Sequence, residues 1–136
     1  MKQSIFKFSK PAVEKLNYNM KENCNIANLK GKAIPFSFDT KVEMFDNNKG
    51  AQVVLSIKSE DVEDFPFVFC IDMSSRVKWD VEVSKAMLDS ILNKNVPAMI
   101  LSYARPIISM ITSHSDYKAL DLPFIDMRDS SSDKKE

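Results

Sequence analysis

The chain has 136 residues, the length of a single domain whose apolar core can form without disulfides or a structural metal. Nineteen basic and nineteen acidic side chains cancel, so net charge gives no general attraction to nucleic acid or to an anionic membrane. Two cysteines are too few for a disulfide framework, two glycines are few for phosphate-binding loops, and no apolar run reaches the ~20 residues that span a bilayer. These features favour a cytoplasmic protein without membrane insertion or nucleic-acid binding.

The first part of the chain is predicted to form β-strands, because apolar and polar residues alternate along it. The alternation covers 12–20, and Phe6 and Phe8 repeat it on the far side of Pro11. A proline has no amide hydrogen for a strand ladder, so this first strand is expected to begin early and to break at Pro11. An irregular crossing loop is expected at 23–35.

Three further strands are expected at 36–44, 52–59 and 65–73. The segment 46–50 separates the first two, and its aspartate, asparagines and glycine are typical of a turn. Those two strands are therefore expected to form a hairpin. The last strand carries apolar residues on both faces, which places it inside the sheet.

After the strands, the apolar residues repeat with the period of a helix. A short helix is expected over 85–93, and a longer one begins near Asn95, which can act as a cap. Four strands followed by two helices predict an α+β fold, with a four-stranded antiparallel sheet and two C-terminal helices packed on one face. The domain covers 1–127, and the charged and serine-rich segment 128–136 is expected to be a disordered polar tail.

The longer helix is unusually apolar for a small domain, in which most of a helix circumference is normally polar. Its main apolar face consists of Ile100, Leu101, Ala104, Ile107, Ile108 and Ile111. A second stripe beside that face consists of Met99, Tyr103 and Met110. One side of the helix is therefore expected to pack on the sheet and the other on a second subunit.

Two irregular segments, 24–35 and 117–127, carry large apolar side chains, although loops normally run over the surface. Large exposed apolar patches mark surfaces for protein partners, and the eight methionines suit surfaces that repack around varied partners. The alternative is that both segments cover the core of their own subunit. The candidate client-binding residues, including two from the short helix, are Ile26, Leu29, Ile34, Met87, Ile91, Leu120, Leu122 and Phe124.

The residues that could support catalysis are isolated. His114, the only histidine, lies at a predicted helix end, where its positive charge suits the helix C-terminus. Cys70 lies within a strand and is predicted to be a buried thiol. The acidic run 60–64 lacks the glycine and the spacing of a calcium loop. We therefore expect no enzyme activity, no metal site and no cofactor.

The segment Val96–Arg105 combines a proline at the helix start with the triplet Tyr103-Ala104-Arg105. It is followed by Ile108 and by a Leu-Asp-Leu-Pro loop at 120–123. This C-terminal third resembles the SecB protein-export chaperone family, and the order of the predicted strands and helices is similar too. The resemblance implies a homotetramer, built as a dimer of dimers, that holds unfolded or newly synthesised polypeptides without ATP, including polypeptides for export.

The resemblance leaves two partners open besides unfolded clients. One is the SecA motor of protein export. The other is an antitoxin, since divergent SecB-like proteins also serve toxin–antitoxin systems, which gives the alternative of a dedicated binding module for a single partner. The residues assigned to oligomer contacts or to structure are Met99, Tyr103, Ala104, Arg105, Ile107 and Met110.

Overall fold

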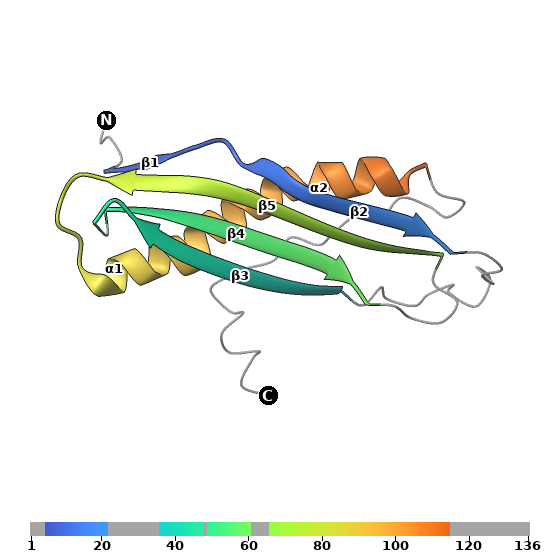
Figure 1. Cartoon of the computed structure of the whole chain (residues 1–136), viewed down its shortest axis with the longest axis horizontal. Helices are drawn as coiled ribbons and strands as arrows, with labels where there is room; N and C mark the ends of the chain where they lie inside the picture. The colour runs from blue at the N-terminus through green and yellow to red at the C-terminus, as the bar shows by residue number, and fades with distance from the viewer. Residues whose placement is uncertain (1–4, 22–35, 48, 61–65, 115–136) are drawn as a thin grey trace.

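The protein is an antiparallel sheet with a long helix on one side of it (Figure 1). The computed structural model describes residues 5–21, 36–47, 49–60 and 66–114. The strands are β1 (Phe6–Phe8), β2 (Ala12–Met20), β3 (Phe36–Phe45), β4 (Gly50–Ser59) and β5 (Phe67–Trp79). The helical elements are α1 (Lys85–Ser90), the π-helical turn η2 (Ile91–Asn95) and α2 (Val96–Thr112).

The strand β5 is the centre of the sheet. It pairs with β4 on one side and with both β1 and β2 on the other, and β3 pairs with β4 at the opposite edge. The α+β class and the antiparallel sheet are confirmed, but the prediction of four strands is wrong, since the sheet has five. The first strand is divided at Pro11, where Ser9 fills the gap in the ladder. The Ser9 amide donates to the carbonyl oxygen of Arg76, and the Ser9 hydroxyl accepts from the Arg76 amide, both at 2.8 Å.

The strand β5 runs on to Trp79, beyond its predicted end at Met73. Ser74 and Ser75 suggest a strand end from sequence, yet both are buried in the sheet. The Ser74 hydroxyl donates to Glu14 at 2.9 Å, and the Ser75 hydroxyl donates to the carbonyl oxygen of Ser9 at 2.7 Å. Because a buried hydroxyl with a partner avoids the desolvation penalty, the strand continues through both serines.

A β-bulge at Glu14 sets the direction of the side chains on β2. The register of β2 on β5 shifts between Val13 and Lys15. As a result, both Val13 and Leu16 lie opposite buried residues of β5, which are Met73 and Ile71. The Glu14 carboxylate, on the outer side of the sheet, accepts from Gln52 at 3.0 Å as well as from Ser74. Because of the bulge, Val13 before it and Leu16 after it both point to the side of the sheet on which α2 lies.

The core lies between α2 and the two middle strands, β4 and β5. The predicted helix face is confirmed, since Ile100, Leu101, Ala104 and Ile108 are buried. On the sheet the most deeply buried aliphatic residues alternate along β4 and β5, as expected for strands with one face in the core. They are Val53, Leu55, Ile57, Ile71 and Val77.

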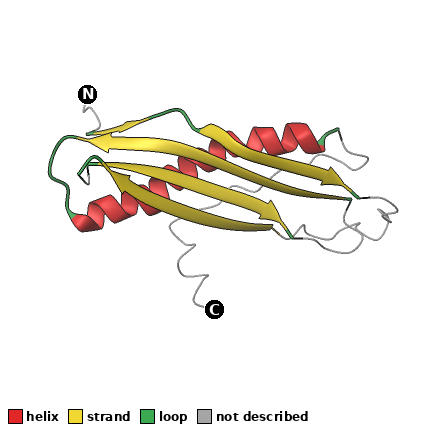
Figure 2. Ribbon diagram, in the orientation of Figure 1, coloured by secondary structure: helices red, strands yellow, loops and turns green. Residues whose placement is uncertain are grey.

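Within the described residues only one helix packs on the sheet, so the prediction of two packed helices is wrong. None of the residues of α1 is buried, whereas Leu92 in η2 and seven residues of α2 are. The π-helical turn joins α1 directly to α2, and the continuous helix carries α1 toward the end of the sheet (Figure 2).

No helix among the described residues is long and apolar enough to cross a membrane.

The packing of α2 on the sheet can be tested with Ile100→Ala, because this side chain is fully buried. We expect a loss of about 2–5 kcal/mol in the free energy of unfolding, measured with urea, from lost apolar burial and the cavity left behind. The matched control is Ile5→Ala, since Ile5 is exposed, and it should change stability by less than about 0.5 kcal/mol. Equal losses in both variants would contradict this core.

Candidate partner-binding surfaces

The titratable residues do not converge in the described part of the chain, where no three of the His, Cys, Asp and Glu residues are grouped to hold a metal ion. His114 is exposed after the end of α2. The prediction of a buried Cys70 is wrong, because its neighbours Phe69 and Ile71 point to the core and Cys70 points to the other side of the sheet. It is half-buried there, with its sulfur 3.9 Å from Asp72 Oδ1.

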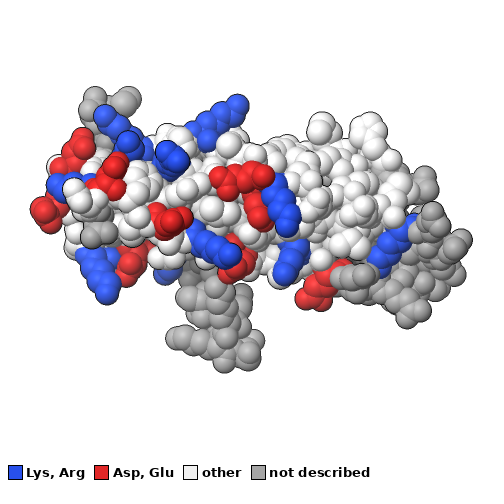
Figure 3. Space-filling model, viewed as in Figure 1, with Lys and Arg blue, Asp and Glu red and all other residues white. Residues whose placement is uncertain are grey.

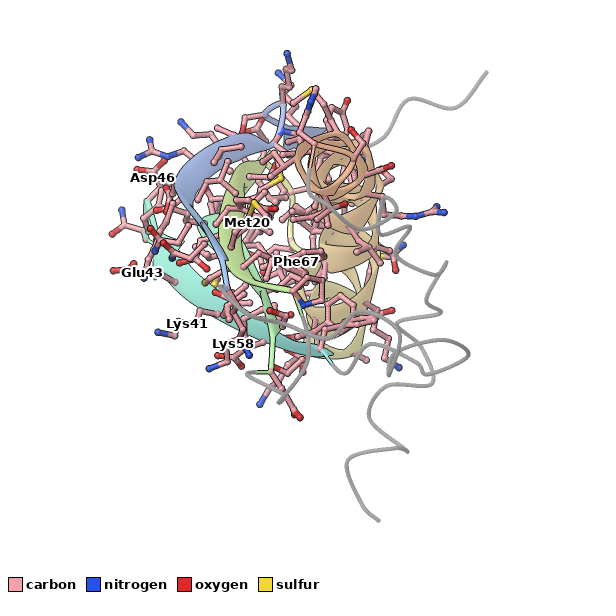
Figure 4. The ribbon with its side chains drawn as sticks, turned by 90° about the vertical axis from the view of Figure 1, so that its right-hand side faces the viewer. Met20, Lys41, Glu43, Asp46, Lys58 and Phe67 are labelled. Carbon is pink, nitrogen blue, oxygen red and sulfur yellow. The ribbon has the colours of Figure 1, made fainter. Side chains whose placement is uncertain are left out.

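The outer face of the sheet, away from α2, carries intermixed basic and acidic side chains over one half and few charged side chains over the other (Figure 3). Lys41, Glu43 and Asp46 lie on this side, whereas Phe67 lies between the sheet and α2 (Figure 4). The ion pair between Lys78 and Asp46 on this face, at 3.6 Å, is exposed and contributes little to stability. Because acidic side chains interrupt the basic ones, the face is not the continuous basic platform that a nucleic-acid site uses.

The helical side of the sheet keeps apolar side chains exposed along β1 and β2. We call Phe8, Val13, Leu16 and Met20 the edge strip, and their exposed fractions lie between 39% and 46%. Their partners across β5 are Val77, Met73, Ile71 and Phe67, which are all buried. The edge strip therefore points to the same side as the core but lies beyond the part of the sheet that α2 covers.

The helix α2 exposes a second apolar stripe, as its sequence predicted. Tyr103 and Met110 have exposed fractions of 43% and 59%, and Met99 and Ile107 are half-buried against the core. The C-terminal half of α2 runs along the β2 side of the sheet in both Figure 1 and Figure 4. We call this stripe and the edge strip together the β2-edge surface. Of the other residues assigned to structure, Ala104 is fully buried and Arg105 is half-buried.

Exposed apolar side chains also lie near the end of the molecule at which the β3–β4 turn, the end of β5 and α1 are found (Figure 1). We call Met44, Val81 and Met87 the α1-end surface, and their exposed fractions are 37%, 47% and 51%. Beside Val81 is an open pocket of about 180 Å³. The other residues that line this pocket are Asn47, Lys49, Trp79, Glu82, Val83 and Leu88.

The structure describes two of the eight candidate client-binding residues. Met87 is exposed on α1, and Ile91 is half-buried against the core. Sequence reasoning missed Met44 and Val81, because Met44 shares the parity of a core-facing strand and Val81 lies in a short connection without periodicity. The other candidates lie outside the described residues. They are Ile26, Leu29, Ile34, Leu120, Leu122 and Phe124.

No protein-family model matches the sequence, and neither does any curated protein. Among solved structures, the SecB-like chaperone of Mycobacterium tuberculosis, in complex with a ChAD peptide from the HigA1 antitoxin, is similar with a TM-score of 0.71. The match covers 88% of this chain and 90% of that chain at 10% sequence identity. The chain has a SecB-like fold. The fold implied by the tyrosine–alanine–arginine and leucine–proline motifs is therefore confirmed.

A second solved structure, a protein of unknown function from Streptococcus agalactiae, is similar with a TM-score of 0.54 and 14% identity. The match covers 88% of this chain and 97% of that chain. In both comparisons the structural similarity extends over most of each chain.

The two apolar surfaces are expected to contribute little to folding. Val81→Lys and Met87→Lys should each change the free energy of unfolding by less than about 0.5 kcal/mol in urea titrations, since both side chains are largely exposed. Leu101→Lys is the contrasting variant, because it places a charge in the core and should prevent stable folding. A large destabilisation by Val81→Lys or Met87→Lys would assign these residues to the fold instead.

Proposed function

We propose that this protein is an ATP-independent molecular chaperone that holds unfolded or newly synthesised polypeptides in the cytoplasm, including polypeptides awaiting export. The observation that supports the proposal most is the exposure of large apolar side chains on two separate surfaces of a SecB-like fold. Monomeric proteins rarely expose contiguous apolar patches without a partner for them. The mechanism has no chemical step and needs no cofactor.

The attraction for a client comes from covering apolar surface. Each square ångström removed from water contributes about 25 cal/mol, so a well-covered Met or Val side chain contributes about 1.5–3 kcal/mol at most. The methionines of the α1-end surface have flexible, polarisable side chains that adapt to clients of different shape. One such surface gives binding in about the millimolar range, which suits a chaperone that must release its client.

The sheet edges provide a second contribution to client binding, which does not depend on the sequence of the client. Within the described residues no strand pairs with the free side of β3, which runs for ten residues in regular register with β4. The unpaired amide and carbonyl groups of an edge strand can bind an extended backbone of any sequence. Side chains on β3 and on the α1-end surface then bind the same client segment, because Met44 belongs to both.

We assign the β2-edge surface to self-association, with the dimer of dimers as the proposed assembly. A second copy related by a two-fold axis covers the edge strip and the Tyr103–Met110 stripe of both subunits at once. Several client-binding surfaces in one particle turn weak sites into strong binding, because a bound segment raises the effective concentration of the next.

A dedicated binding module for a single partner is the second candidate. It is favoured by one observation, which is that the similar mycobacterial SecB-like chaperone was solved with an antitoxin peptide. In this case an antitoxin segment would occupy the α1-end surface, and unrelated unfolded chains would not. The two candidates differ in breadth of clients, and neither requires SecA for the binding step itself.

The chaperone function predicts that the protein suppresses aggregation of several unrelated denatured proteins, measured by light scattering. The double variant Val81→Lys/Met87→Lys should bind a fluorescent unfolded client at least about fivefold more weakly, since two apolar contacts are lost. The matched control is Asn17→Lys/Asn19→Lys, which adds the same charge to exposed positions on the outer face of β2.

Four outcomes decide between the candidates. Suppression of aggregation for unrelated clients supports the general chaperone. Tight binding of one antitoxin segment without such suppression supports the dedicated module. Equal weakening of client binding in Val81→Lys/Met87→Lys and in Asn17→Lys/Asn19→Lys contradicts the α1-end surface as the binding site of either candidate. No binding of any polypeptide contradicts both candidate functions.

The self-association proposal predicts an oligomer in multi-angle light scattering at micromolar concentration. Tyr103→Lys/Met110→Lys should reduce the particle mass. The new lysines of neighbouring subunits repel one another, and the apolar contact between the stripes is lost. The control Ser102→Lys/Ser113→Lys adds the same charge to exposed polar positions of the same helical region and should leave the mass unchanged. A monomeric wild-type protein would overturn the assignment.

A further inference from the structure

Methionines are unusually exposed in this protein. Six lie among the described residues, and four of them, Met20, Met44, Met87 and Met110, are exposed by more than a third of their surface. Met73, by contrast, is 2% exposed in the core, which is the usual position for this residue type. An exposed thioether is accessible to small oxidants, so the four exposed methionines differ in reactivity from Met73.

Two of the exposed methionines, Met44 and Met87, belong to the α1-end surface. They come from elements far apart in the sequence, β3 and α1, and β3 contacts η2, the turn next to α1. The pocket lined by Asn47 of the β3–β4 turn and by Leu88 of α1 lies beside this surface, although neither methionine lines it. Apart from Val81, the exposed apolar area of this surface is therefore contributed by methionine.

The chemistry requires a hydroperoxide such as hydrogen peroxide as oxidant. A lone pair of the methionine sulfur attacks one peroxide oxygen, the O–O bond breaks, and a sulfur–oxygen bond forms. The sulfur loses two electrons and the peroxide is reduced. The departing hydroxide takes the proton of the new sulfur-bound hydroxyl, which leaves the sulfoxide and one water. The product, methionine sulfoxide, is polar, and methionine sulfoxide reductases convert it back.

We propose that Met44 and Met87 form a reversible oxidation site that switches off polypeptide binding at the α1-end surface. The proposal rests on the function proposed above and adds its regulation. A sulfoxide oxygen binds water strongly and has no donor in an apolar client, so covering it leaves a desolvated acceptor without a partner. The surface that attracts apolar segments in the reduced protein then becomes a polar one, while the core keeps its reduced Met73.

The test uses the full-length protein treated with hydrogen peroxide, then with catalase and dithiothreitol, which restores oxidised cysteines but not methionine sulfoxide. Mass spectrometry of peptides should show that Met44 and Met87 are oxidised before Met73. Binding of a fluorescent denatured client should fall about tenfold and return after treatment with the two sulfoxide reductases.

Two leucine variants separate this site from the other exposed methionines. After peroxide, Met44→Leu/Met87→Leu should keep more of its client binding than the wild type keeps, each compared with its own untreated protein, because leucine is similar in size and cannot be oxidised. The matched control Met20→Leu/Met110→Leu should lose binding as the wild type does. Where the double variant is too unstable to measure, Met87→Leu alone, at an exposed position of α1, should retain part of the binding.

The outcomes that overturn the proposal are distinct from those that overturn the function. Unchanged binding by a wild type with both methionines oxidised, or equal loss in the Met44→Leu/Met87→Leu variant, rejects the switch and leaves the chaperone function standing. An untreated wild type that binds no denatured polypeptide rejects the proposed function, and the switch with it.

Discussion

The packing of one helix against the middle of the sheet determines which apolar residues stay exposed. An α-helix with its side chains is about 10–12 Å wide, and neighbouring strands are about 4.8 Å apart, so one helix covers about two strands. The helix α2 lies on β4 and β5. Apolar residues on the helical side of β2 and β3 then remain partly uncovered, and the exposure of Leu16 and Met44 follows from this geometry.

The outer strands keep their apolar faces because polar contacts on the sheet hold them in place. Glu14 joins β2 to Ser74 on β5 and to Gln52 on β4, and Ser9 bonds to both Ser75 and Arg76. These contacts fix the register of an edge strand that α2 does not cover. Glu14 thus stabilises the edge strip from the opposite side of the sheet, which leaves its apolar side chains available for a partner.

Local patterns in the sequence predicted the elements, and contacts distant in sequence explain the errors. The hairpin turn at 46–50 was predicted from its composition, and Asp46 and Asn47 indeed adopt positive φ. The end of β5 was misplaced because the partners of Ser74 and Ser75 lie more than 55 residues away. Met87 was predicted as a surface residue. Val81 and Met44 were not, because only the folded structure brings their elements to the same end of the molecule as α1. The fold is similar to that of the mycobacterial structure at 10% sequence identity, so it does not require the same residues at most positions.

In the proposed function, the α1-end surface binds unfolded polypeptide while the hydrophobic core remains folded and out of contact with the client. Methyl NMR of protein labelled at its methionine methyl groups tests this directly, since the methionines report on both places. Addition of an unfolded client should shift the signals of Met44 and Met87 and leave that of buried Met73 unchanged. Unshifted Met44 and Met87 signals in the presence of bound client would show that the polypeptide binds elsewhere and would contradict the account.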